Sequence, residues 1–331
     1  MIRFAFIFDM PHINSIEYKP PWYLFNGHWE TVVPSSFRKV KGISYERERI
    51  DTPDGDFLDL DWVKKGHGRL VIISHGLEGS SERPYVMGMA KAFSNEKWDV
   101  LAWNCRSCSG EMNRKARFYH HGDTPDLDTV IQHALNSGSY GFVSLVGFSM
   151  GGSMTLKYMG ERGEDVNPKI KSAVAFSVPV SLKSSVEELS KKGNGFYRKR
   201  FLKKLSDKMQ QKAELIPDFD ADGVHDIKTF EAFDNRFTAP MFGFKDAEDF
   251  YSSSSSSNFI PGIRRPSLLI NALNDPFLGE ACYPYDLAEQ NPNFFFQTPK
   301  RGGHVGFSGK KNGVTWGEQR AIDFIRENCG C

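Results

Sequence analysis

Short apolar runs recur along the chain and give the first indication of its fold. Runs of this kind are typical of strands that are buried on both faces of a sheet. They lie at residues 69–74, 100–103, 142–146, 173–177, 267–271 and 294–297. Helical patterns separate the first four of them, at about residues 85–95, 124–135 and 153–160. This alternation predicts an α/β protein in which helices flank both faces of a mostly parallel central sheet.

The chain before residue 69 has a different pattern. Charged residues at 45–50 and alternating apolar and polar residues at 58–62 flank a turn at 52–56. This arrangement predicts an antiparallel hairpin. Residues up to about 36 carry aromatics and prolines with no clear period. We expect residues 1–40 to form an N-terminal arm that packs on the core.

The alternation stops at 182–250, where Lys, Asp and Phe are frequent and the pattern is helical. A run of serines at 252–257 then predicts a flexible or loosely packed connection, after which strand-like runs return. The sequence therefore predicts one α/β core, formed by residues 41–181 and 258–331. A helical cap or lid, residues 182–257, is inserted after the sixth strand.

The composition is that of an ordinary globular protein. Of 331 residues, 40% are hydrophobic and 25% are charged, and 42 Lys and Arg are balanced by 41 Asp and Glu. This balance offers no basic surface for nucleic acid, and no run approaches the roughly 20 apolar residues of a membrane span. We expect a cytoplasmic protein without stable membrane insertion. A basic stretch at 191–204 could touch anionic lipid transiently, but a solvated helix face is the commoner explanation.

The five cysteines do not predict a disulfide framework, because their number is odd and the chain is long. Cys105 and Cys108 form a C-x-x-C pair. No second pair and no suitably spaced histidines accompany it, so we expect no metal site. None of the motifs considered below calls for an organic cofactor.

The most informative segment is Gly-Phe-Ser-Met-Gly at 147–151. It matches G-x-S-x-G, with a buried strand before it and a helix after it, which is the context that this motif requires. The turn is so tight that Gly147 and Gly151 must lack side chains. Ser149 would present its hydroxyl above the sheet, where the helix N-terminus favours a developing negative charge. A tight turn that contains a serine by chance is the alternative.

A serine hydroxyl needs a base, and in this topology the partners follow in the order Ser, acid, His. Of the two downstream histidines, His225 lies in the predicted insertion, whereas His304 lies in a glycine-flanked loop after the last strand. His304 is therefore the expected base. Asp275 follows the strand at 267–271, and active sites are built at such strand ends. It is the expected acid in preference to Glu280 and Asp286, which fall farther along the chain.

A second backbone donor beside the N–H of Met150 would complete an oxyanion hole. The turn after the strand at 69–74 contains Gly76, which lets the backbone approach a bound group closely. We assign this donor to the N–H of Leu77. The neighbouring His75 precedes Ser149 in the chain, so we interpret it as a residue that orients the loop and not as a base.

Several segments together resemble the α/β-hydrolase superfamily and, within it, the YheT-like branch, which is related to eukaryotic membrane-anchored α/β-hydrolase-domain proteins. They are Asn-Gly-His-Trp-Glu-Thr at 26–31, His-Gly-Leu-Glu-Gly-Ser at 75–80, Asn-Cys-Arg-Ser-Cys-Ser-Gly-Glu at 104–111, Tyr-His-His-Gly-Asp-Thr at 119–124 and Gly-Phe-Ser-Met-Gly-Gly at 147–152. The resemblance covers the chain from about Pro20. It implies the α/β-hydrolase fold, a Ser149, Asp275 and His304 triad, and esterase or lipase-like activity. Ser107 departs from the glycine that such proteins often have, and the expected absence of the relatives' N-terminal anchor argues against membrane residence.

Some residues allow two interpretations. Arg106 and His120 either contact substrate or anchor loops near the pocket, and the second role is the commoner for buried polar groups. The segment at 26–29 either covers the pocket or braces the sheet. The aromatic residues of the predicted insertion either line an acyl groove or form the insertion's own core; they are Phe196, Phe201, Phe230, Phe233, Phe237, Phe242 and Phe244.

These residues predict a serine hydrolase that cleaves a small-molecule acyl ester through an acyl-enzyme. Three other functions remain open. An acyltransferase would use the same triad and pass the acyl group to an alcohol. A peptidase or amidase is compatible with the triad, but no feature of the sequence favours a peptide substrate. A non-catalytic binding protein could keep the fold, although such a protein has no need of the complete triad.

Overall fold

The computed structural model describes residues 18–311 and 313–329. Its centre is an eight-stranded sheet in the order β1-β2-β4-β3-β5-β6-β7-β8. The hairpin of β1 and β2 is antiparallel, and β2 is antiparallel to β4, whereas all other neighbours run parallel. The strands are β1 (Glu46–Asp51), β2 (Phe57–Val63), β3 (Arg69–Ser74), β4 (Asp99–Asn104), β5 (Phe142–Phe148), β6 (Ile170–Phe176), β7 (Ser267–Ile270) and β8 (Phe294–Gln297).

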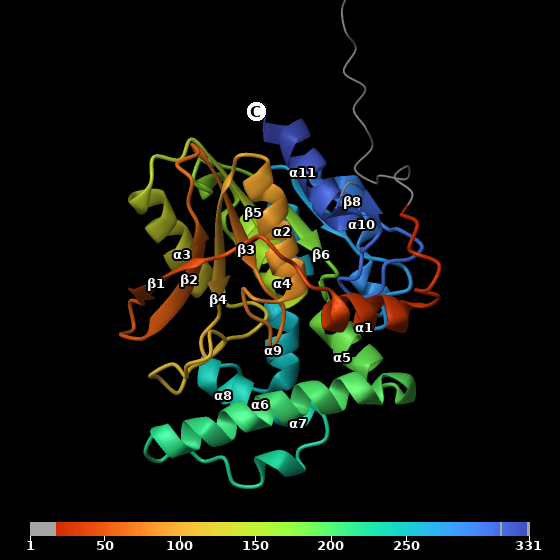
Figure 1. Ribbon diagram of the computed structural model, residues 1–331. Coiled ribbons are helices and arrows are strands. Elements are labelled where there is room, and N and C mark those ends of the chain that lie inside the picture. The colour runs from red at the N-terminus through yellow and green to blue at the C-terminus, as the bar shows by residue number, and fades with distance from the viewer. Residues whose placement is uncertain (1–17, 312, 330–331) are drawn as a thin grey trace, which may run out of the picture.

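Helices cover both faces of this sheet (Figure 1). Outside the segment between β6 and β7, the α-helices are α1 (Gly27–Phe37), α2 (Pro84–Asn95), α3 (Thr124–Ser137), α4 (Met150–Arg162), α10 (Tyr285–Gln290) and α11 (Trp316–Cys329). Two short strands, β9 (Lys310–Lys311) and β10 (Val314–Thr315), pair beside α11. The predicted α/β architecture is thus confirmed.

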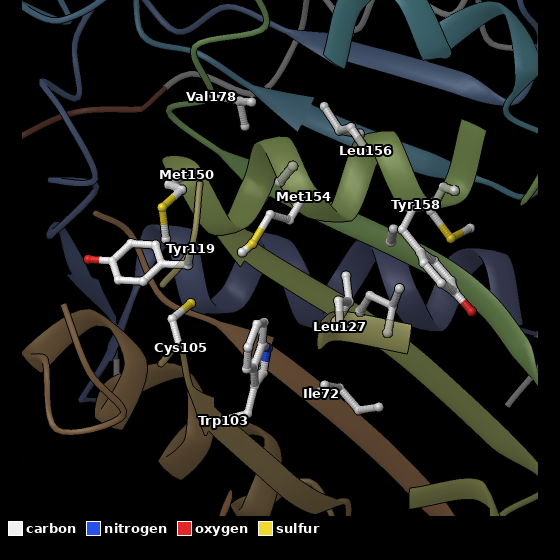
Figure 2. Close-up of a cluster of buried hydrophobic side chains, with 14 of the residues drawn as sticks. Ile72, Trp103, Cys105, Tyr119, Leu127, Met150, Met154, Leu156, Tyr158 and Val178 are labelled. Carbon is white, nitrogen blue, oxygen red and sulfur yellow. The ribbon is translucent and has the colours of Figure 1, made fainter. Parts of the chain in front are cut away.

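The core lies in two layers because successive side chains of a strand point to opposite faces. On one face, Val71 and Ile73 of β3 pack with α2 and α11. On the other face, Ile72 packs with α3 and α4. Figure 2 shows this second layer, where Met154 of α4 and Leu127 of α3 lie above Trp103 and Ile72 of the sheet.

The segment between β6 and β7 is helical, as expected for an insertion after the sixth strand. It contains α5 (Leu182–Ser190), α6 (Gly195–Leu215), α7 (Phe230–Phe233), α8 (Ala239–Phe242) and α9 (Ala247–Ser254). In Figure 1 these helices gather at one end of the sheet, with α6 lying across it. None of the helices in the described residues is both long and apolar enough to cross a membrane.

One local expectation was wrong. The serine run is not a loose connection: Ser252 to Ser254 complete α9, and the buried Ser255 hydroxyl donates to the carbonyl of Tyr251 and accepts from the N–H of Leu182. Composition alone missed this because burial and hydrogen bonding decide whether serines are ordered. The predicted arm contains a regular helix, α1, whose N-terminus is capped by Asn26. Residues 1–17 of that arm lie outside the described residues.

Candidate active site

Ser149 occupies the single position between the end of β5 and the start of α4. Its backbone has φ 53° and ψ −117°, a conformation that L-residues rarely adopt. The N–H of Ser149 donates to the carbonyl of Phe176 at the end of β6, at 2.8 Å. The turn therefore projects the serine side chain beyond the carboxyl end of the sheet.

Both glycines of the motif are required by close backbone packing. A Cβ at Gly147 would lie 2.4 Å from the carbonyl oxygen of Gly151. A Cβ at Gly151 would lie 2.4 Å from the carbonyl oxygen of Ser74 at the end of β3. Because the opposing atoms belong to the backbone, no side-chain movement could relieve either clash.

The structure brings Ser149, His304 and Asp275 into one chain of hydrogen bonds. His304 Nε2 lies 2.9 Å from the Ser149 hydroxyl oxygen, and His304 Nδ1 lies 2.9 Å from Asp275 Oδ2. The Asp275 carboxylate is fully buried and also accepts the N–H of Phe277. The Phe277 ring stacks on the imidazole with centroids 4.0 Å apart. By contrast, His225 lies on the insertion with its side chain 53% exposed and takes no part in this arrangement.

The loop that carries His304 is held by α1, a contact that the sequence analysis missed. The N–H of His304 donates to Thr31 Oγ1 at 2.9 Å. The fully buried Glu30 carboxylate accepts from the guanidinium of Arg301, from the N–H of Gly302 and from the side-chain amide of Asn274. Glu30 and Thr31 therefore support the histidine loop, and Thr31 also borders a pocket beside Ser149. The Asn26 cap followed by an acidic first turn was the available sequence signal for this helix.

The turn that follows β3 lies against Ser149. A Cβ at Gly76 would come within 3.1 Å of the Ser149 Cβ. The N–H groups on either side of Leu77 are both engaged: that of Gly76 donates to the Tyr85 hydroxyl, and that of Glu78 donates to the Tyr119 hydroxyl. These bonds fix the turn around Leu77.

His75 is buried behind this turn and does not reach the serine. Its Nδ1 donates to the carbonyl of Gly76 at 2.7 Å, and its Nε2 accepts the N–H of Cys105 at 3.0 Å. Burial lowers the pKa of His75 to about 4, so the imidazole is neutral near pH 7. Its contacts connect the ends of β3 and β4.

Two chambers meet at Ser149. The first, which we call the apolar chamber, has a volume of about 80 Å³. Its walls include Leu182, Leu189, Leu205, Phe230, Phe233 and Phe250 from the insertion. The second, which we call the cationic chamber, has a volume of about 100 Å³, and its walls include Arg83, Arg200 and Lys204. Both chambers are bordered by Leu77, Ser149, Phe201, Phe277 and His304.

Of His75, Arg106 and His120, which the sequence placed near the pocket, only His120 lines a chamber. It faces the apolar chamber within ring-contact distance of Phe242, Phe244 and Phe250, and burial lowers its pKa well below the usual value. His75 and Arg106 border neither chamber.

Arg106 anchors a separate network. Its guanidinium pairs with Asp126 at 2.8 Å and with Asp54 at 2.7 Å, and it also reaches Asp56. The hydrogen bonds from Arg106 hold the pKa of Asp54 well below its ordinary value. Arg106 thus acts as a loop anchor, the commoner of the two roles left open, because these carboxylates bind all three nitrogens of its guanidinium.

The aromatic residues of the insertion divide between the two roles left open by the sequence. Phe201, Phe230 and Phe233 line the apolar chamber, whereas Phe237 packs within the insertion and Phe196 is 64% exposed. The apolar chamber also contains polar residues that no motif had indicated. Asp234 accepts the hydroxyls of Thr238 and Tyr251, and all three residues border the chamber. Within residues 18–311 and 313–329, no cluster of three or more His, Cys, Asp or Glu is arranged to hold a metal ion.

The sheet order, the turn around Ser149 and the helical insertion together define an α/β-hydrolase. The family model described as the alpha/beta hydrolase fold matches residues 69–310, and the chain belongs to this family.

Relatives place the chain more narrowly. It is 29% identical over 321 residues to YheT of Escherichia coli (strain K12), a match that covers 94% of each chain. It is 28% identical over 315 residues to phospholipase ABHD3 of Bos taurus, covering 91% of this chain and 76% of that protein. An esterase of Pyrococcus furiosus shares the fold with a TM-score of 0.59 and 18% identity, over 88% of this chain and 96% of the esterase. The predicted membership of the YheT-like branch is thus confirmed.

Proposed function

We propose that this protein is a serine hydrolase that cleaves carboxylic acyl esters through an acyl-enzyme. The observation that carries the proposal is the chain of hydrogen bonds from Ser149 through His304 to Asp275, which opens on an apolar chamber. The similarity to a phospholipase, which by its name acts on ester-containing lipids, supports ester chemistry.

The reaction follows from the geometry. Ser149 Oγ attacks the acyl carbonyl while His304 Nε2 takes its proton, and Asp275 keeps the other imidazole nitrogen protonated and stabilises the imidazolium. The N–H groups of Leu77 and Met150 hold the oxyanion of the tetrahedral intermediate. His304 then protonates the leaving alcohol. Water attacks the acyl-enzyme with His304 again acting as base, which releases the acid and restores Ser149.

The apolar chamber is the proposed site for the acyl chain. The insertion lines it mainly with leucines and phenylalanines, which favour a hydrocarbon over a polar group, although Asp234, Thr238 and Tyr251 also border it. In this proposal residues 182–257 act as a cap that shields the acyl-enzyme from bulk water. Hydrolysis then depends on water that enters beside His304.

The test measures hydrolysis of nitrophenyl esters from acetyl to dodecanoyl. We expect Ser149→Ala and His304→Ala each to lower kcat by more than about 10³-fold, because members of a triad act as a unit. His225→Ala should retain wild-type rates, since this histidine lies away from the serine. A fluorophosphonate should label wild type and not Ser149→Ala.

Two results would reject the proposal. One is ester hydrolysis that persists unchanged in Ser149→Ala. The other is a wild-type protein that neither turns over any ester nor reacts with the fluorophosphonate, which would favour a non-catalytic binding protein. If added alcohol diverts the acyl group into a new ester faster than water releases the acid, the enzyme is an acyltransferase with the same site.

A further inference from the structure

The cationic chamber carries positive charge that no carboxylate of the described residues neutralises. Arg83, Arg200 and Lys204 all border it, and none of the three forms an ion pair within residues 18–311 and 313–329. Lys203, the residue before Lys204 on the same helix, by contrast pairs with Asp207 at 2.7 Å. Arg83 lies just before α2, whereas Arg200 and Lys204 lie one turn apart on α6. Three cations from two elements thus converge beside the serine.

The acidic residue that borders this chamber is engaged elsewhere. Glu78 pairs with Lys208 at 2.8 Å and accepts the hydroxyl of Tyr119. Its carboxylate is therefore balanced by a cation that does not line the chamber. Glu78 therefore does not cancel the positive charges of Arg83, Arg200 and Lys204, and the wall of the cationic chamber is positively charged.

Two further observations show that this charge is held at a cost. The Nε of Arg83 is buried without a hydrogen-bond acceptor, which is unfavourable for a charged group. Burial lowers the pKa of Lys204, and the nearby charges of Arg83, Arg200 and Lys208 lower it further, against the opposing effect of Glu78. Lys204 Nζ has one backbone acceptor, the carbonyl of Glu78 at 3.2 Å. A bound anion would relieve both costs.

The position of the chamber indicates which part of a substrate enters it. The two parts of an ester separate at the carbonyl that Ser149 attacks. If the hydrocarbon chain fills the apolar chamber, the alcohol lies on the other side of the serine, next to the His304 that protonates it. The cationic chamber is therefore the place for the alcohol part.

On this basis, and resting on the proposed esterase function, we propose that the cationic chamber is a binding site for a phosphate group on the alcohol part of the substrate. Arg83 offers a planar fork that fits two phosphate oxygens, and Lys204 offers a point charge. Arg200 lies exposed at the mouth, where it attracts the anion before it binds. The substrate class is an acyl ester of a phosphate-bearing alcohol.

The test compares two substrates that differ only in the phosphate. We would measure kcat/KM for hexanoylglycerol phosphate and for hexanoylglycerol, both kept below their aggregation limits. Wild type should prefer the phosphate ester by about 10–100-fold, the range expected for hydrogen bonds between charged groups. The double variant Arg83→Met with Lys204→Met should lose at least tenfold of this preference, mainly through KM. Lys203→Met removes an exposed cation of the same helix and should keep the preference.

The ratio of the two rates makes the result independent of folding. A variant that folds poorly loses both activities alike, whereas loss of a phosphate site changes their ratio. Equal kcat/KM for the two esters in wild type would overturn the proposal while leaving the esterase function intact. No turnover of either ester, together with no labelling of Ser149, would instead reject the esterase function. A third substrate is a hexanoyl ester whose alcohol carries a carboxylate in place of the phosphate. If wild type prefers it over hexanoylglycerol, in kcat/KM, as strongly as it prefers the phosphate ester, the assignment of phosphate is overturned.

Discussion

Ser149 is held in a left-handed backbone conformation that costs about 1–3 kcal/mol for a residue with a side chain. Contacts near Ser149 offset this cost. Its N–H donates to the carbonyl of Phe176, and the flanking glycines allow β5, α4 and the end of β3 to approach closely. The G-x-S-x-G spacing made this turn predictable, because the chemistry and the backbone constraint lie within five residues. Asp275 and His304 were predictable from their order and from the strand ends that precede them.

Asp234 shows what such short-range reasoning misses. Its carboxyl group lies in the apolar chamber, where burial raises its pKa to about 6, against the opposing effect of hydrogen bonds from Thr238 and Tyr251. No motif surrounds it, and only the folded insertion brings these three residues together. A sequence pattern cannot indicate a polar residue whose partners are defined by tertiary packing.

Asp234 should make stability depend on pH. An unfolded carboxyl group titrates near pH 3.9, so between about pH 4 and pH 6 the folded protein binds more protons than the unfolded chain. The stabilising contribution of the protonated group is complete below about pH 4 and is lost as the pH rises through about 6. This loss is absent in Asp234→Asn. Between pH 4.5 and pH 7 we expect the free energy of unfolding to fall by about 2 kcal/mol more in wild type than in the variant.

Urea unfolding of wild type and variant at pH 4.5 and pH 7 measures this difference. Asp222→Asn is the matched control, because Asp222 lies exposed on the same insertion. If wild type and Asp234→Asn lose stability equally over this interval, burial of the carboxyl group is not responsible.

Among the elements, the strands and the helices between them were predicted because their apolar periods are strong. The helix α1 was not, because Pro34 lies within it and the aromatics in it and before it are exposed, namely Trp22, Tyr23, Phe25 and Trp29. Its buried residues are the polar Glu30 and Thr31, the reverse of an amphipathic pattern. The reason is that these two side chains bind the backbone of the histidine loop.

Glu30 should act as a positioning residue for His304. Glu30→Gln keeps the size of the side chain but removes the charge that holds Arg301 and the N–H of Gly302. We expect the free energy of unfolding to fall by about 1–3 kcal/mol and kcat to fall at least tenfold with little change in KM, since the imidazole is displaced while both chambers persist.

Steady-state kinetics with a nitrophenyl ester separates kcat from KM. Ser36→Ala changes an exposed residue of the same helix and should leave both constants unaltered. A purely structural role for Glu30 would lower the amount of folded enzyme and leave kcat per labelled serine unchanged.

In the whole molecule, the α/β core supplies Ser149, Asp275 and His304, while the insertion supplies most of the apolar wall. The boundary between the two chambers is formed in part by Phe201 of α6, which packs against Phe277 with ring centroids 5.9 Å apart. The position of the insertion after the sixth strand was predicted correctly from the sequence. The sequence did not predict that one wall would be apolar and the other cationic, because that division depends on how α6 crosses the end of the sheet.

Removal of the Phe201 side chain should join the chambers. We expect Phe201→Ala to extend the longest acyl chain accepted and to flatten the dependence of kcat/KM on chain length, with a stability loss of about 3–5 kcal/mol. The nitrophenyl ester series gives this profile. Phe196→Ala, an exposed position on the same helix, should reproduce the wild-type profile. An unchanged optimum and width in Phe201→Ala would show that other residues separate the chambers.

The contact between Glu30 and Arg301 has a consequence for biosynthesis. The two residues are 271 positions apart, and at about 5–20 residues per second a ribosome needs on the order of 15–50 s to make the chain between them. During that interval the nascent polypeptide can form the strand and turn around Ser149, but its histidine loop has not been translated. Ser149 therefore lacks its hydrogen bond to His304 until residue 304 has been synthesised. The proposed catalytic competence should therefore appear only after residues 301–304 have been synthesised and have docked on α1.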